Sequence, residues 1–445
     1  MKTRGLLLLL PVALGMAFGQ AGQDCPRVGQ GELRVEVAGL PPGLPARLRV
    51  SGPGGYSQTL TGSQSLRVAA GPYALQAETL ADSHPIVRQA YRGGQSRICV
   101  RANRTTSARI EYRLIPTSGR VWFGEQLRHR VYGFPRSQLG AAGMLRPSPD
   151  ANTQAFAALA FDREGNLWIA RRFGSEPHLY RYAATSLSRE NPTPDRRINL
   201  RGLSQNHRVN ALAFDREGNL WIAAYTADSV FRLSAAQLES AGSGPTALAP
   251  QVTLSVAGPS SLAFDREGNL WVGRGEAGSL AEPEVLRYNR ARLGRSIPAG
   301  QGPDRNLTTL HWNRINRLGN SSLAFDREGN LWVMSLVSGT LHRLPKEVLS
   351  GTGSQTFDNP DADGILRIFL GNGRLYGMAF DEGGGLWVTY GSDRLAWLSP
   401  AQLTASTAAS DPLTPERVFT LSSALPHSPA LFPAPAGLPL FHSLP

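Results

Sequence analysis

The sequence predicts an all-β protein: a six-bladed β-propeller, closed by its C-terminal strand and preceded by a small β-sandwich. The octapeptide FDREGNLW occurs four times unchanged, beginning at Phe161, Phe214, Phe264 and Phe325, and a fifth time as FDEGGGLW from Phe380. The copies are about 50 to 60 residues apart, which is the size of a propeller blade built from short strands. The period and the identity of the copies therefore predict the fold.

Within each copy, alternating apolar residues predict four strands. In the copy at Phe214 these are residues 211–214, 220–223, 230–233 and 252–254. The first two strands are joined by residues 215–218, where Asp215 suits the first position of a type I turn and Gly218 the left-handed position. Trp221 is expected to fill the wedge between adjacent blades. We therefore assign the repeated Asp, Gly and Trp to structure.

The segments between the third and fourth strands also have a pattern. Residues 234–238 and 399–403 begin with serine, which suits the cap of a short helix. The loops that follow, such as 241–250, are rich in Gly, Ser and Pro and vary in length between copies. We expect them to decorate one face of the propeller.

The first blade is incomplete at its beginning. Residues 121–124 and 131–134 match a second and third strand, but no LAFD-like strand precedes them. Residues 428–432, followed by 437–440, mimic the missing part, so the C-terminus is predicted to complete this blade and cover both open sheet edges. This gives six blades over residues 116–445. Seven is the alternative, if residues from 438 and from 121 belong to separate blades.

The amino terminus predicts export. Residues 1–19 have a basic start at Lys2 and Arg4, an apolar run over 6–18, and small residues at Ala17 and Gly19. This is the pattern of a signal peptide. No later stretch reaches the roughly 20 apolar residues of a spanning helix, so we expect a periplasmic or secreted protein without a transmembrane anchor.

Residues 20–115 lack the repeat and instead show short alternating strands separated by Gly/Pro turns, which predicts the β-sandwich. Cys25 and Cys99 are the only cysteines, and in an oxidising compartment such a pair predicts a disulfide. Two separate buried thiols remain the alternative. The cadence of residues 70–75 and 100–106 resembles carboxypeptidase-regulatory-like and other transthyretin-like modules, which implies a spacer or adhesive role.

The repeat resembles those of two-component-regulator-type, NHL-like and streptogramin-lyase-like propellers, whose hairpins also run D-x-x-G-N-L-W. The resemblance extends over five copies and implies the fold. Those families include sensors, scaffolds, lyases and metal-dependent lactonases, so it does not imply one activity.

The candidate site follows from topology. Antiparallel strands place every Asp-Arg-Glu-Gly turn on one face, the turn face. The connections after second strands and before first strands lie on the other, the loop face, and differ between blades. Their cations, amides and tyrosines are expected to bind a carboxylated sugar or peptide. The candidate ligand-binding residues are Glu125, Arg171, His207, Asn210, Tyr225, Arg274, Glu276, His311, Asn320, Arg374, Tyr376 and Tyr390.

The formal charge of +12 favours anionic partners. Only Lys2 and Lys346 are lysines, which indicates a general preference for arginine as much as a binding device. For an exported protein we expect a glycan, envelope component or protein partner and no nucleic acid.

The sequence thus predicts a non-catalytic binding or scaffold protein that recognises a polymer, glycan or protein at its loop face, with no catalytic residue, metal site or cofactor. The alternative is a divalent-metal-dependent lactonase or lyase, with an ion in the central channel and dependence on Glu276, His207 or Asn210. A third hypothesis is carbohydrate adhesion through the amino-terminal module.

Overall fold

The structure is a computed structural model. It forms two compact units: unit 1 comprises Met1–Glu78 and Arg92–Arg113, and unit 2 comprises Thr79–Tyr91 and Leu114–Pro445. The predicted signal peptide lies outside the described residues. The described residues are 25–125, 130–140, 142–144, 150–152, 158–171, 178–189, 191–204, 207–274, 284–309, 320–335, 339–357, 363–371, 373–421, 429–436 and 438–440.

Unit 1 is built from short strands in two groups. In one, β1 (Gln30–Ala38) pairs antiparallel with β4 (Gln64–Ala69) and parallel with β9 (Thr105–Leu114). In the other, the order is β3 (Ser57–Leu60), β2 (Leu48–Ser51), β5 (Gly71–Ala77) and β8 (Gln95–Val100), with the 3-10 turn η1 (Pro53–Gly55) between β2 and β3. The predicted disulfide between Cys25 and Cys99 is present, with Cα atoms 5.7 Å apart. It ties the start of the described chain to β8.

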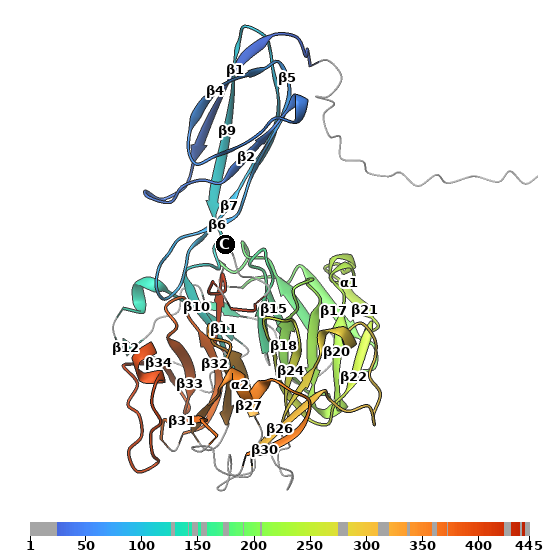
Figure 1. The fold of residues 1–445 in the computed structure, drawn as a ribbon, viewed down its shortest axis with the longest axis vertical. Helices are drawn as coiled ribbons and strands as arrows, with labels where there is room; N and C mark the ends of the chain where they lie inside the picture. Colours follow the sequence, from blue (N-terminus) through green and yellow to red (C-terminus); the bar gives the residue numbers. More distant parts are fainter. Residues whose placement is uncertain are drawn as a thin grey trace, which may run out of the picture. The chain divides into compact units, whose positions relative to one another are not determined.

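The described strands of residues 114–445 form six sheets, which we call blades 1 to 6 (Figure 1). Blade 1 contains β36 (Ala430–Phe432), β10 (Arg120–Glu125), β11 (Arg130–Pro135) and β13 (Asp150–Asn152). Blade 2 contains β14 (Ala158–Phe161), β15 (Leu167–Ala170), β16 (Leu179–Tyr182) and β17 (Arg196–Leu200). Blade 3 contains β18 (Val209–Phe214), β19 (Leu220–Ala224), β20 (Ser229–Leu233) and β22 (Val252–Ser255).

The other three blades repeat this antiparallel order. Blade 4 contains β23 (Pro259–Phe264), β24 (Leu270–Arg274), β25 (Glu284–Tyr288) and β26 (Arg305–Thr309). Blade 5 contains β27 (Asn320–Phe325), β28 (Leu331–Ser335), β29 (Thr340–Leu344) and β31 (Leu366–Phe369). Blade 6 contains β32 (Leu375–Phe380), β33 (Leu386–Tyr390), β34 (Arg394–Leu398) and β35 (Arg417–Thr420).

Three outer edges gain an extra parallel strand from a loop of the next blade. These strands are β21 (Pro245–Leu248) beside β17, β30 (Gly353–Phe357) beside β26, and β12 (Gly143–Met144) beside β35. The loop at 241–250 is therefore more than decoration, since it covers an edge that would otherwise expose unpaired backbone groups.

The predicted closure by the C-terminus is confirmed. β36 pairs antiparallel with β10, with Phe432 opposite Arg120 and Ala430 opposite Trp122. Residues 438–440 form no strand. The first and last strands of the described blades, β10 and β36, thus share one sheet.

The repeated turn is held by its aspartate. Asp215 Oδ1 accepts hydrogen bonds from the backbone N–H groups of Glu217 and Asn219, at 3.1 and 2.9 Å. Asp215 Oδ2 accepts from Asn219 Nδ2 and Trp221 Nε1, both at 2.9 Å. Gly218 has φ +84°, the left-handed conformation that favours glycine. Asn219 Oδ1 in turn accepts from Ala235 N, the first residue of α1 (Ala235–Ser240). The motif is structural, as predicted.

The repeated tryptophan joins each blade to the next. Trp221 packs edge-on against Phe264 of blade 4, with ring centroids 6.1 Å apart. The same contact is made by four further pairs: Trp122 with Phe161, Trp168 with Phe214, Trp271 with Phe325, and Trp332 with Phe380. All five tryptophans are fully buried, so they fill the wedges between blades.

The helices of unit 2 are short. Ser234 caps α1 through a reciprocal capping box with Gln237, and Ser399 with Gln402 does the same at η5 (Pro400–Leu403), as predicted. The remaining turns are α2 (Lys346–Leu349), η2 (Arg136–Gln138), η3 (Tyr225–Ala227) and η4 (Arg290–Arg292). No helix in the described part of the chain is long and apolar enough to cross a membrane.

Residues 79–91 pack on the propeller although they precede its first blade in sequence. They include β6 (Leu80–Ala81) and the start of β7 (Ala90–Gly93). Arg88, only 6% exposed, forms an ion pair with Glu382 at 3.0 Å and donates to Ala434 O at 2.8 Å. This segment thereby holds both the fifth repeat and the C-terminal tail.

Candidate functional site

The two faces of the propeller differ in what they repeat. In blade 3 the turn at Asp215 follows Phe214, which pairs with Leu220, while the opposite end of β19 leads into the loop at Tyr225. The turn face therefore shows the same octapeptide in blade after blade. The loop face carries residues that occur once, which a unique binding site requires.

A central channel runs between the first strands of the blades. It contains a cavity of about 190 Å³, and none of the described residues that line it is charged. The residue before each repeated Phe is alanine, at Ala160, Ala213, Ala263, Ala324 and Ala379. The residue before that is large and apolar, at Leu159, Leu212, Leu262, Leu323 and Met378. The described lining of the channel is thus mainly apolar.

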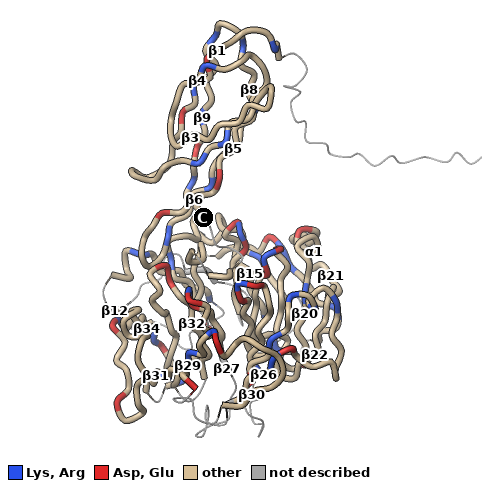
Figure 2. Tube along the Cα trace, viewed as in Figure 1, with Lys and Arg blue, Asp and Glu red and all other residues tan. Residues whose placement is uncertain are grey.

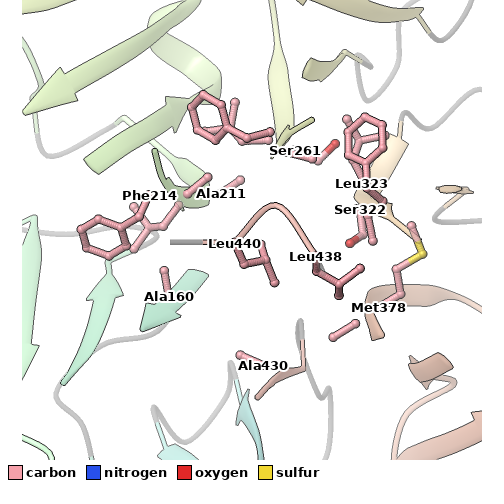
Figure 3. Close-up of a pocket in the computed structure, with 18 of the residues that line it drawn as sticks. Ala160, Ala211, Phe214, Ser261, Ser322, Leu323, Met378, Ala430, Leu438 and Leu440 are labelled. Carbon is pink, nitrogen blue, oxygen red and sulfur yellow. The ribbon is translucent and has the colours of Figure 1, made fainter. Parts of the chain in front are cut away.

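The C-terminal tail enters this channel. Figure 3 shows Leu438 and Leu440 inside the ring of first strands, with Leu438 on the side of Met378. Leu438 is 8% exposed and packs in the same core as Phe380. Ala436 N donates to Glu382 Oε2 at 3.0 Å, which holds the tail at the turn face.

On the loop face, two blades present an arginine stacked on a tyrosine. The Arg208 guanidinium carbon lies 5.3 Å from the centre of the Tyr225 ring in blade 3. In blade 6 the Arg394 guanidinium lies 5.8 Å from the Tyr390 ring, and a hydrogen bond to Tyr390 raises the pKa of Arg394. Arg394 and Arg374 are both exposed. The Tyr390 ring itself is buried at 9% exposed, so the accessible groups are the two exposed arginines and the partly buried Tyr225.

Other predicted loop-face residues are engaged within the protein. Arg274 donates to Ala257 O at 3.1 Å and pairs with Glu284, whose other oxygen accepts from Asn306 Nδ2. His207 Nδ1 accepts from Ser204 N at 2.8 Å and closes its own loop.

The remaining described candidates differ in burial and in location. Glu125 is 1% exposed, and its Oε2 accepts from the Tyr132 hydroxyl at 3.1 Å. Arg171 N donates to His178 O. The partly buried Tyr376 lies in β32. Asn210 lines the channel cavity.

Three candidates are not fully described. Asn320 begins β27 opposite Ser335, but its side chain lies outside the described residues. Glu276 and His311 also lie outside them. Within the ranges that are described, no three His, Cys, Asp or Glu side chains gather where they could hold a metal ion.

Two channel residues were missed by sequence reasoning. Ser261 and Ser322 line the cavity in blades 4 and 5, each three residues before the repeated Phe. At the same position blades 2, 3 and 6 carry Ala158, Ala211 and Gly377. Alignment of the copies shows these hydroxyls as departures, and that signal could have found them.

The basic charge is uneven. The described residues of unit 1 include eleven arginines and four glutamates, so this unit alone is strongly basic. Figure 2 shows the basic positions spread along its strands. Such a surface favours anionic neighbours.

Comparison with known proteins matches one copy of the repeat to a family. Residues 202–226 match the two component regulator propeller family. No curated protein matches the sequence. Among solved structures, a streptogramin B lyase is 11% identical, with 71% of this chain and 86% of that chain covered at a TM-score of 0.36.

Two further solved structures are similar. A putative gluconolactonase is 18% identical, with 62% of this chain and 82% of that chain covered at a TM-score of 0.38. The extracellular domain of the putative one component system BT4673 from B. thetaiotaomicron is 15% identical, with 76% and 42% covered at a TM-score of 0.36. At these identities and scores, the likenesses carry no functional argument.

Proposed function

We propose that the protein is an exported, non-catalytic binding protein whose propeller recognises a carboxylated glycan at its loop face. The observation that carries the proposal is the pair of Arg–Tyr stacks in blades 3 and 6, with the exposed Arg374 on the same face. None of these residues belongs to the repeated octapeptide; Tyr390 also packs in the core of its blade, whereas Arg374 and Arg394 are exposed.

The chemistry of these groups fits a carboxylated sugar. Arginine presents a planar fork of N–H donors that matches a carboxylate, and charge-assisted hydrogen bonds of this kind are the strong ones. A tyrosine ring supplies an apolar face for a sugar ring and a hydroxyl for its polar edge. An Arg already stacked on a Tyr loses little freedom on binding, which favours affinity.

Export is supported by the disulfide between Cys25 and Cys99, because disulfides persist in oxidising compartments. The basic unit 1 supports an anionic ligand class, since its charge raises the local concentration of polyanions.

The test is calorimetric titration of the purified chain with oligogalacturonate, a carboxylated glycan. Its methyl ester serves as an uncharged control of the same backbone. The loop-face variants are Arg374→Ala, Arg394→Ala and Tyr225→Ala. The matched control is Arg216→Ala, which removes an exposed arginine from the turn face.

We expect binding of the acid but not the ester, and a loss of about tenfold in affinity for each loop-face arginine variant. Arg216→Ala should bind as the unchanged protein does. Equal binding of acid and ester, or an equal loss in Arg216→Ala, would overturn the proposal. Release of unsaturated or hydrolysed products during the titration would overturn its non-catalytic part.

A further inference from the structure

The channel contains a buried hydroxyl that no packing role explains. Ser261 is 3% exposed, and no described residue lies within hydrogen-bond distance of its Oγ. Ser322, 8% exposed, occupies the same strand position in the next blade. Buried polar groups in proteins almost always have a partner, so an unpartnered one that lines a cavity points to something that binds there.

The polar groups of the channel lie on one side. Asn210, Ser261 and Ser322 come from the consecutive blades 3, 4 and 5. The rest of the lining is apolar: Met378 and the tail residue Leu438 lie beside Ser322, and Ala160 and Ala430 lie further round the channel (Figure 3). A ligand here therefore meets hydroxyls along one edge and hydrocarbon around the rest.

The size of the cavity limits the ligand. Its volume is about 190 Å³, and a dry protein cavity of about 150 Å³ is enough to bind benzene. No described lining residue is charged, so a charged ligand would lose its hydration without compensation. The fitting class is a small, uncharged and flat molecule.

We propose that the channel is a binding site for a small apolar ring compound with one N–H or O–H group, held by the hydroxyls of Ser261 and Ser322. The hydroxyl of Ser261 accepts a hydrogen bond from that group. The leucine and alanine side chains that surround the channel contact the rest of the molecule. This site does not depend on the glycan proposed for the loop face.

The position of the C-terminal tail, residues 434–440, bears on how a ligand reaches the channel. Arg88 donates to Ala434 O, and Glu382 accepts from Ala436 N, so the tail is held at the turn face. Leu438 and Leu440 follow this anchored stretch and line the cavity (Figure 3). Because the tail is anchored at the turn face, we expect the ligand to enter from the loop face.

The experiment compares two probes of the same shape. Indole carries one N–H group, and indene replaces it with carbon. Binding of each to the full chain is measured by calorimetry, with Ser261→Ala as the test variant. Ser260→Ala is the matched control. The hydroxyl of Ser260, next to Ser261 in sequence, donates to Gly273 O and does not line the channel.

We expect indole to bind about tenfold more tightly than indene, the usual scale of one hydrogen bond. Ser261→Ala should remove that preference and leave indene affinity unchanged, whereas Ser260→Ala should preserve it. Ser261→Ala should also raise the melting temperature of the ligand-free protein, because it removes an unpartnered buried hydroxyl.

A second variant locates the site. Ala263→Leu adds bulk to the channel wall and should abolish binding of both probes. Failure of both probes to bind the unchanged protein would overturn the proposal. So would a preference for indole that survives Ser261→Ala, or binding that survives Ala263→Leu.

Discussion

Four copies of the octapeptide are identical, and the fifth departs from them at three positions. Where the others have Arg, Glu and Asn, the fifth has Glu382, Gly383 and Gly385. In the identical copies most buried residues serve their own blade or the next, and Gly165, whose carbonyl accepts from the Thr117 hydroxyl, is the exception among those described. In the fifth copy the departures contact segments from elsewhere in unit 2.

Each departure has a structural reason. Glu382 forms ion pairs with Arg88 and Arg327 and accepts a hydrogen bond from Ala436 N, so it joins three distant parts of the chain. A Cβ at Gly383 would lie 2.9 Å from Pro85 O, so only glycine lets residues 85–86 approach.

The third departure exchanges one hydrogen-bond donor for another. A Cβ at Gly385 would lie 2.4 Å from Trp397 Nε1. The Trp397 indole donates to Asp381 Oδ2 at 2.7 Å, in the place that the asparagine amide takes in the other copies. Identity among repeats thus marks what a blade needs, and departure marks where a non-repeated segment docks.

The largest effect is expected from an identical copy. Trp221→Ala removes a fully buried ring that packs on Phe264 and bonds to Asp215. It should lower the free energy of unfolding by about 3 to 5 kcal/mol. Chemical denaturation checks this, and a loss below about 1 kcal/mol would contradict the wedge role.

A smaller effect is expected when the fifth copy is returned to consensus at its first departure. Glu382→Arg places a third guanidinium beside Arg88 and Arg327 and leaves the buried Arg88 without its carboxylate. The loss should be about 3 kcal/mol, with faster proteolysis of the C-terminal tail. The control is Arg216→Glu, which gives an identical copy the glutamate found in the fifth copy. It should change the free energy of unfolding by less than about 0.5 kcal/mol.

Gly385→Asn tests the donor exchange. The new side chain collides with Trp397, so a loss of about 1 to 3 kcal/mol is expected. Where Trp397 lies opposite Trp387, the copy in blade 3 has Arg232 opposite Trp221. The double variant Gly385→Asn/Trp397→Arg restores that pattern and should recover part of the loss. A double variant no more stable than the sum of its parts would contradict the exchange.

The smallest effect concerns pH. Burial raises the pKa of Asp381 to about 6, although N–H donors from Trp397, Gly385, Gly383 and Trp387 lower it. An unfolded aspartate titrates near pH 4, so the folded form retains its proton longer as pH rises. Its contribution to stability is therefore full below about pH 4 and falls towards pH 6, by at most about 1.4 kcal/mol per pH unit.

Unfolding free energies at pH 4, 5 and 6 check this, as the difference between the unchanged protein and Asp381→Asn. That difference should shrink as pH rises. Growth of the difference over the same range would show that the carboxylate is favoured in the folded state.

Local rules explain what could be predicted. The Asp215 turn, the Trp221 wedge, the Ser234 cap and closure by β36 follow from the period and from residues close in sequence. Other features depend on partners far along the chain. The extra strand β21 and the Arg88 contacts gave no periodic signal.

The candidate site was predictable only in outline. Topology located the loop face, but the state of each side chain depends on its neighbours. Glu125 is buried beside Tyr132 and Arg274 is paired with Glu284, whereas Arg374 and Arg394 remain exposed. The hydroxyls of Ser261 and Ser322 differ from alanine by one atom, which is too little to stand out in a search for charged groups.

The most direct measurement is a calorimetric comparison of the two faces with oligogalacturonate. The double variant Arg374→Ala/Arg394→Ala removes two exposed arginines from the loop face. The control Arg189→Ala/Arg216→Ala removes two exposed arginines from the turn face. The two double variants therefore change the net charge equally. The loop-face variant should lose at least about tenfold in affinity and the turn-face variant less than about twofold. Equal losses would show attraction by net charge alone and would contradict a binding site on the loop face.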